Sequence, residues 1–228
     1  MVTLTRPEPR GPIIFLDFDG TLVDIRQKYF ALHCHLARKL DFNPGFIDDF
    51  WRLKRGQAQS IDLTGGRGAS VAARYERLWL ELIETPTFTS RDTVLPGVAE
   101  VLHGLRDSTE LALVTLRRDP LVLRKQLQYL HLNAVFGEIL VSGEYPDVAR
   151  SKPSLIQHSR WKGRRPAMVV GDTADDAAAA ASLDIPFIAV NSGLRDASKF
   201  RDQALAVIDT AADLPEILPL ALDSAGNR

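Results

Sequence analysis

The sequence predicts an α/β fold: a parallel β-sheet with helices on both faces and a small all-helical insertion after the first strand. Two patterns support this prediction. Short β-branched or aromatic runs alternate along the chain with helical segments, as expected for parallel strands joined by helices. From residue 25 to about residue 90 the alternation stops, and apolar residues recur only at helical spacing.

Six segments have the composition of strands. Several are almost entirely apolar, which is typical of strands that are covered on both faces. The predicted strands span residues 13–18, 111–115, 138–141, 167–170, 186–190 and 206–208.

Four helices are expected between these strands. Residues 96–105 place valine and leucine side chains on one face. Asp119 followed by Pro120 is a favourable cap and first turn for a helix that ends near residue 130. Pro153 opens a further helix, and residues 173–183 are alanine-rich with high helix propensity.

The insertion contains three segments with helical spacing. They span residues 25–40, 46–53 and 71–82, and a glycine-rich loop over 56–68 precedes the third. We therefore expect an α/β unit formed by residues 1–24 and 91–228, and a helical unit formed by residues 25–90.

Composition and charge exclude several classes of partner. The net charge is −1, which gives no attraction to nucleic acid or anionic membranes, so we expect neither. The single cysteine, Cys34, cannot form an intrachain disulfide, and this favours a reducing compartment. No apolar run approaches the ~20 residues of a membrane span, and the first twelve residues lack the apolar centre of a signal peptide. We expect a cytoplasmic protein; no sequence feature indicates its oligomeric state.

The strongest chemical signal is the first strand and its end, Ile-Ile-Phe-Leu-Asp-Phe-Asp-Gly-Thr from residue 13 to residue 21. Side chains two apart in an extended chain point to the same side. Asp17 and Asp19 therefore converge just beyond the carboxyl end of the strand, where open α/β sheets bind ligands. Two carboxylates so close repel each other unless they share a cation or a proton. The alternative is a strand that ends in an Asx turn, with Gly20 for backbone freedom.

Asp17-Phe18-Asp19-Gly20-Thr21 resembles the first motif of the haloacid dehalogenase-like (HAD) hydrolases, and three further motifs of that superfamily follow in order. Val114-Thr115 resembles the second motif and Lys152 the third. The acidic segment over residues 171–176 resembles the fourth. The match extends from about residue 13 to residue 194. It implies a Rossmann-like core with a helical cap after the first motif, as in the phosphoglycolate phosphatase-like branch.

The resemblance also implies roles for individual residues. Asp17 is the expected nucleophile and Asp19 the general acid/base. Mg²⁺ is the expected cofactor, with Asp17 and Asp172 supplying side-chain oxygens and Asp19 its backbone carbonyl. Thr115 and Lys152 are expected to bind the phosphoryl group.

The acidic segment contains two further carboxylates with different expectations. Asp176 is expected to orient water or Lys152 from outside the metal shell. Asp175 is explained as an acidic residue favoured by the helix dipole at the start of a helix.

The presence of Asp19 separates two reactions. Release of a halide needs no proton, whereas a phosphatase must protonate the leaving alkoxide and then deprotonate water. The predicted function is therefore Mg²⁺-dependent hydrolysis of a small-molecule phosphate monoester through an aspartyl-phosphate. A phosphosugar mutase with the same chemistry and a non-catalytic interaction protein on the same scaffold remain alternatives.

The substrate is less well indicated. Arg55 and Arg67 in the cap and Arg117 after Thr115 are candidates for contact with a second acidic group of the substrate; the alternative for each is a solvated surface arginine. The segment after Lys152 lacks the second proline of many phosphoglycolate phosphatases.

Overall fold

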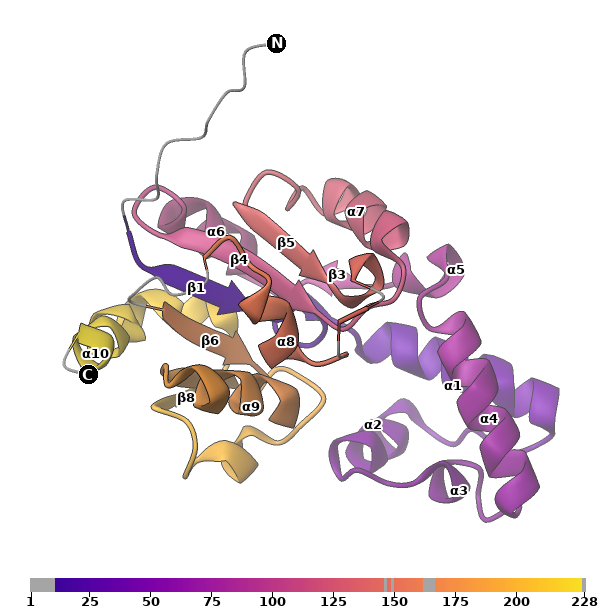
Figure 1. Ribbon diagram of the computed structural model, residues 1–228. Helices are drawn as coiled ribbons and strands as arrows, with labels where there is room; N and C mark the ends of the chain where they lie inside the picture. Colours follow the sequence, from indigo (N-terminus) through magenta and orange to yellow (C-terminus); the bar gives the residue numbers. More distant parts are fainter. Residues whose placement is uncertain (1–10, 146, 149, 162–166, 227–228) are drawn as a thin grey trace, which may run out of the picture.

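The computed structural model describes residues 11–145, 147–148, 150–161 and 167–226. Its centre is a parallel sheet in the order β5-β4-β1-β6-β7-β8 (Figure 1). The predicted α/β architecture is confirmed, and all six predicted strands are present with small shifts at their ends. These strands are β1 (Ile13–Leu16), β4 (Glu110–Thr115), β5 (Glu138–Val141), β6 (Ala167–Gly171), β7 (Phe187–Val190) and β8 (Ala206–Ile208).

Helices cover both faces of this sheet because the strand side chains alternate between two apolar cores. Ile14 and Leu16 of β1 enter one core, whereas Ile13 and Phe15 enter the other. The first core is closed by α6 (Val98–Leu105), α7 (Pro120–Tyr129) and α10 (Leu214–Gly226), and the second by α8 (Lys152–Gln157) and α9 (Ala174–Leu183). Short 3₁₀-helices complete the unit at η1 (Ser142–Glu144), η2 (Ala197–Phe200) and η3 (Ala211–Asp213).

Helices α1 to α5 form the insertion, which lies beyond the carboxyl ends of the central strands (Figure 1). It has an apolar core of its own that includes Leu36, Phe50 and Tyr75. Besides the three predicted helices there are two short ones, one of them inside the predicted glycine-rich loop. The bounds are α1 (Arg26–Leu40), α2 (Ile47–Arg55), α3 (Ser60–Leu63), α4 (Ala69–Leu82) and α5 (Pro86–Thr89).

The chain enters and leaves the insertion through two adjacent short strands. β2 (Val23–Asp24) and β3 (Thr93–Val94) pair antiparallel. The sequence analysis did not predict this pair, because two residues are too few to show a strand pattern. No helix in the described ranges combines the length and the apolar character needed to cross a membrane.

Candidate active site

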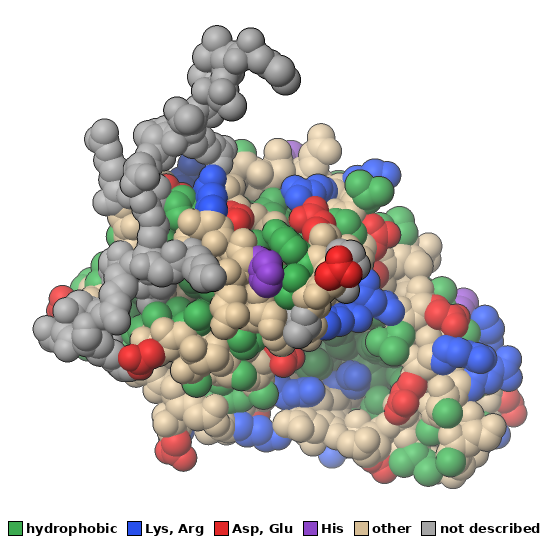
Figure 2. Space-filling model, in the orientation of Figure 1, with side chains coloured by type: hydrophobic (Ala, Val, Ile, Leu, Met, Phe, Trp, Pro, Cys, Tyr) green, Lys and Arg blue, Asp and Glu red, His purple; other side chains and the backbone are tan. Residues whose placement is uncertain are grey.

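The sheet topology brings the predicted site residues together at one edge. Asp17 follows β1, Thr115 ends β4 and Asp172 follows β6, and these three strands are neighbours in the sheet. Lysine and arginine side chains gather in the hollow between the sheet and the helical insertion (Figure 2). A cavity opens here, lined by residues of both parts: Asp17, Asp19, Ile25, Lys28, Tyr29, Ile83, Glu84, Thr115, Leu116, Arg117, Lys152, Thr173, Asp175 and Leu194.

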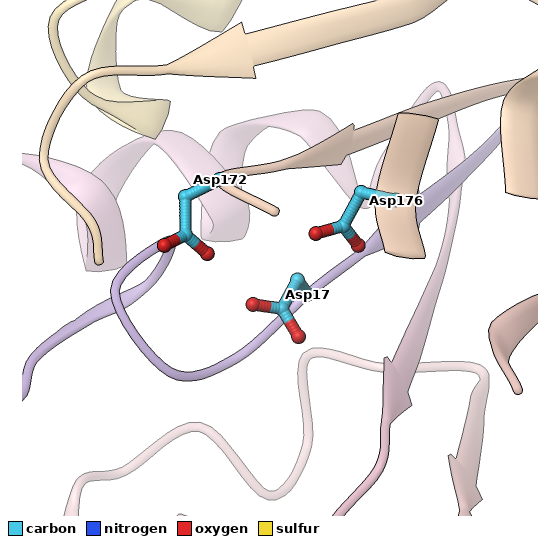
Figure 3. Close-up of side chains that lie close together, drawn as sticks. All are labelled: Asp17, Asp172 and Asp176. Carbon is cyan, nitrogen blue, oxygen red and sulfur yellow. The ribbon is translucent and has the colours of Figure 1, made fainter. Parts of the chain in front are cut away.

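Three buried carboxylates point toward one another at the floor of the site (Figure 3). Asp17, Asp172 and Asp176 each contribute an oxygen to a group whose atoms all lie within 4.8 Å of one another. Burial raises the pKa of Asp17 to about 6, against the opposing attraction of Lys152. Burial, together with the neighbouring carboxylates, raises the pKa of Asp172 well above its ordinary value. The cluster therefore has more negative charge than its protein partners neutralise.

Lys152 provides a positive charge that partly neutralises this carboxylate cluster. Its Nζ lies 2.6 Å from Oδ1 of Asp17 and 2.6 Å from Oδ1 of Asp176. The two carboxylates raise the pKa of the buried lysine despite the opposing effect of burial. Lys152 is the first residue of α8, and the Ser151 side chain caps this helix. The ammonium is therefore held in its charged form beside the predicted nucleophile.

Two carboxylate oxygens in the cluster are only weakly engaged. The Thr21 hydroxyl lies 3.3 Å from Oδ2 of Asp17 and 3.5 Å from Oδ1 of Asp172, and its single proton can serve only one of them well. Asp176 differs, because its Oδ1 is taken by Lys152 and its Oδ2 accepts from the backbone and hydroxyl of Thr173. Mg²⁺ prefers hard oxygen ligands. The buried carboxylate oxygens of Asp17 and Asp172 are such ligands, and protein cations neutralise their charge only in part, so these two residues fit such an ion.

Close packing of glycine keeps Asp172 in this position. A Cβ built on Gly193 would lie 2.1 Å from Oδ2 of Asp172, closer than any side chain tolerates. The backbone N–H of the next residue, Leu194, donates to the same carboxylate oxygen. Gly193 was not identified from the sequence, because its importance depends on a contact with a residue far away in the chain.

Gly193→Ala is therefore expected to turn Asp172 away from Asp17 and to weaken metal binding. We expect the Mg²⁺ concentration for half-saturation of the purified chain to rise by roughly tenfold or more, measured by titrating the metal. Gly104→Ala is the matched control, because a Cβ at Gly104 would have no atom within 4 Å. Equal Mg²⁺ requirements in the two variants would contradict the steric argument.

Asp19 has a different environment from the cluster. Nε and Nη2 of Arg117 lie 2.7 Å from its two oxygens, and Nζ of Lys28 lies 2.7 Å from Oδ1. Burial alone would raise the pKa of Asp19, but the two cations lower it below its ordinary value. Its side chain is 23% exposed and lines the cavity.

Behind these two cations lies Asp92, a fully buried carboxylate. Its Oδ2 lies 2.7 Å from Nζ of Lys28 and 3.2 Å from Nη2 of Arg117. The same oxygen accepts from Nε2 of Gln126 at 2.8 Å, and Oε1 of Gln126 accepts from Nη1 of Arg117 at 2.7 Å. Lys28, Asp92 and Gln126 were not identified from the sequence. Only Lys28 gave a signal, because it occupies the apolar face of α1 between Ile25 and Leu32 at helical spacing.

The remaining predicted residues occupy different places. The Thr115 hydroxyl accepts a bond from the Arg117 backbone and lies in the cavity wall. Arg55 donates to the side chain and backbone carbonyl of Asn191, so it joins the cap to the loop after β7. Arg67 pairs at 3.6 Å with the exposed Asp41 within the insertion. Neither cap arginine is among the residues that line the cavity at Asp17.

Comparison with known proteins identifies relatives that share this organisation. Residues 12–184 match the family model of the haloacid dehalogenase-like hydrolases. A phosphoglycolate phosphatase from Rhodobacter capsulatus is 23% identical over 207 residues, covering 84% of this chain and 93% of the relative.

Solved structures show the same fold. A haloacid dehalogenase-like family protein from Streptococcus pneumoniae superimposes with a TM-score of 0.74 at 17% identity, covering 91% of this chain and 98% of the other. A putative β-phosphoglucomutase from Thermotoga maritima gives a TM-score of 0.66 at 19% identity, covering 92% and 100%.

Proposed function

Since this chain belongs to the haloacid dehalogenase-like hydrolases, we propose that it is a magnesium-dependent phosphatase that hydrolyses a small phosphate monoester through an aspartyl-phosphate on Asp17. One observation carries the proposal: Lys152 holds Asp17 and Asp176 together beside Asp172 at the floor of an open cavity. A buried lysine in this place neutralises both an attacking carboxylate and a phosphoryl group.

The proposed first step forms a bond between a carboxylate oxygen of Asp17 and phosphorus. The bond between phosphorus and the ester oxygen breaks, and the protonated form of Asp19, which Lys28 and Arg117 disfavour in the free chain, supplies the proton that the leaving oxygen requires. Lys152 and the Thr115 hydroxyl hold the oxygens of the phosphoryl group. When bound by Asp17, Asp172 and the backbone carbonyl of Asp19, Mg²⁺ reduces the repulsion between the carboxylate and the phosphate.

In the second step, water attacks phosphorus while Asp19 accepts a proton from it. The bond between phosphorus and Asp17 breaks, so inorganic phosphate leaves and the carboxylate of Asp17 is restored. Asp19 thus acts as acid in one step and as base in the next, which a group two residues after the nucleophile can do from one position.

We further propose that residues 25–90 act as a cap that limits access of water and contacts the rest of the substrate. Several hydrogen bonds join this unit to the core, two sets of which involve arginine side chains. Arg55 bonds to Asn191, and the Arg118 guanidinium bonds to Glu84 at 3.0 Å. The R. capsulatus relative suggests small, acidic phosphate esters as the first substrates to assay.

An assay of the purified chain on small phosphate esters tests the proposal. We expect hydrolysis that requires Mg²⁺ and disappears in excess chelator, and we expect Asp172→Asn to raise the Mg²⁺ concentration for half-maximal activity by roughly tenfold or more. Full activity in excess chelator would overturn the metal assignment. Conversion of a sugar phosphate that depends on added sugar bisphosphate, without release of inorganic phosphate, would identify a mutase instead.

A further inference from the structure

Asp19 is held by a preformed group of charged side chains. Arg117 grips both carboxylate oxygens at 2.7 Å, a bidentate geometry that fixes direction as well as distance. Lys28 adds a third contact at 2.7 Å. The carboxylate therefore has one strongly preferred orientation in the cavity.

The two cations are held in place by further buried contacts. Side-chain exposure is 2% for Lys28, 5% for Arg117 and 0% for Asp92, so the charges lie away from water, where such contacts are strongest. Lys28, Arg117 and Gln126 all donate to the same oxygen of Asp92, and its Oδ1 is buried with no hydrogen-bond partner among the described residues. The hydrogen bonds that the Asp92 side chain accepts from described residues therefore all come from these three donors.

Four of the five N–H donors of Arg117 are engaged in contacts with its neighbours. Nε and Nη2 donate to Asp19, Nη2 also to Asp92, and Nη1 to Gln126. A guanidinium with a partner at each nitrogen holds those partners in place. It has no pair of free N–H groups with which to bind a substrate anion. This favours a positioning role for Arg117 over direct substrate recognition.

These residues come from both parts of the molecule. Lys28 belongs to α1 of the cap, and Asp92 lies between α5 and β3, where the chain returns from the cap. Arg117 follows β4 and Gln126 belongs to α7 of the core. The group therefore spans the junction between cap and core at the position of the catalytic carboxylate.

We propose that Lys28 and Arg117 are positioning residues for Asp19 and that Asp92 anchors them, so that the cap supplies part of the acid/base machinery through Lys28. This inference rests on the proposed phosphatase function. A carboxylate must lie close to its target for efficient proton transfer, and a misplacement of about 1 Å can cost roughly 10²-fold in rate. Removing a positioning contact should therefore impair proton transfer and leave the other parts of the reaction intact.

The test compares two substrates with different leaving groups. Glycerol phosphate needs a proton on its leaving oxygen, whereas nitrophenolate leaves p-nitrophenyl phosphate without one. In Arg117→Lys and in Lys28→Met, we expect kcat/KM, which covers the reaction only as far as departure of the leaving group, to fall by roughly 10- to 100-fold for glycerol phosphate and to fall much less for p-nitrophenyl phosphate. The ratio of the two rates is independent of the folded fraction, so partial unfolding of a variant does not obscure the result.

A second measurement asks whether the effect passes through Asp19. In an Asp19→Asn background, adding Arg117→Lys should change the two rates little, because the group that it positions is already absent. Arg124→Lys is the matched control, since Arg124 on α7 makes two bonds to the carboxylate of Glu144 outside the cavity. It should leave the ratio unchanged.

The possible outcomes separate the two proposals. A wild-type chain without Mg²⁺-dependent hydrolysis would overturn the proposed function and this inference with it. An active wild type whose variants lose kcat/KM equally for both substrates would overturn the positioning role alone. Full additivity of Arg117→Lys with Asp19→Asn would do the same.

Discussion

Asp17→Asn is expected to reduce steady-state phosphatase turnover by more than about 10⁴-fold, because removal of a covalent nucleophile removes the route that it opens. An amide is a poor nucleophile and a weaker ligand for Mg²⁺. The fold should persist, since asparagine has nearly the same shape and Lys152 retains Asp176 as its partner at 2.6 Å. Loss of a buried carboxylate also relieves the repulsion that the cluster imposes.

Turnover and thermal unfolding of the purified variant, measured side by side, check this expectation. Asp202→Asn makes the same chemical change at an exposed turn outside the cavity and should retain full turnover. An Asp17→Asn protein that is folded and turns over within tenfold of the wild type would show that another group attacks phosphorus.

Asp19→Asn should lower turnover of alkyl phosphates by roughly 10²–10⁴-fold, the usual contribution of general acid/base catalysis. An asparagine can neither protonate the leaving oxygen nor accept a proton from water. The change also leaves Lys28 and Arg117 with Asp92 as their remaining carboxylate partner. We therefore expect a lower free energy of unfolding as well, in contrast to Asp17→Asn.

Single-turnover kinetics separate the two steps that Asp19 serves. With p-nitrophenyl phosphate, release of nitrophenolate should remain fast while release of inorganic phosphate slows, so phosphorylated enzyme should accumulate. With an alkyl phosphate, the first step should already be slow. If both esters lose activity to the same degree and no phosphorylated enzyme accumulates, Asp19 has another role.

Much of the fold could be predicted because its signals are local. Apolar runs such as residues 138–141 and 206–208 give the strands directly, and Asp119 followed by Pro120 marks the start of α7. Parallel strands end at one edge of a sheet, so Asp17, Thr115 and Asp172 could be expected near one another before any coordinates were known. In the structure, Asp17 and Thr115 line one cavity, and Asp17 and Asp172 belong to one carboxylate cluster.

The charged group around Asp19 could not be predicted, because its members give no local sequence pattern. Asp92 and Gln126 are single polar residues in unremarkable segments, and the contacts of Asp92 with Gln126 and Lys28 join parts of the chain 34 and 64 residues apart. The short pair of β2 and β3 has too few residues to show alternation. The sequence leaves Arg55 open between substrate contact and a solvated helix face, and only the packing of α2 against the loop after β7 shows its bonds to Asn191.

The antiparallel pair of β2 and β3 also has a consequence for how the chain folds. Pairing β1 with β4 joins Leu16 to Leu113, and in an unfolded chain this closes a loop of about 100 residues, whose entropic cost grows with the logarithm of its length. The insertion has its own apolar core, with buried residues between 32 and 88 and with Tyr29, Phe30 and Ala31 packed against them. Once that core forms, the two ends of the insertion lie close together and Asp24 can pair with Thr93. The loop that must still close to pair β1 with β4 is then short. The insertion that divides the sheet in sequence thus lowers the entropic barrier to assembling it.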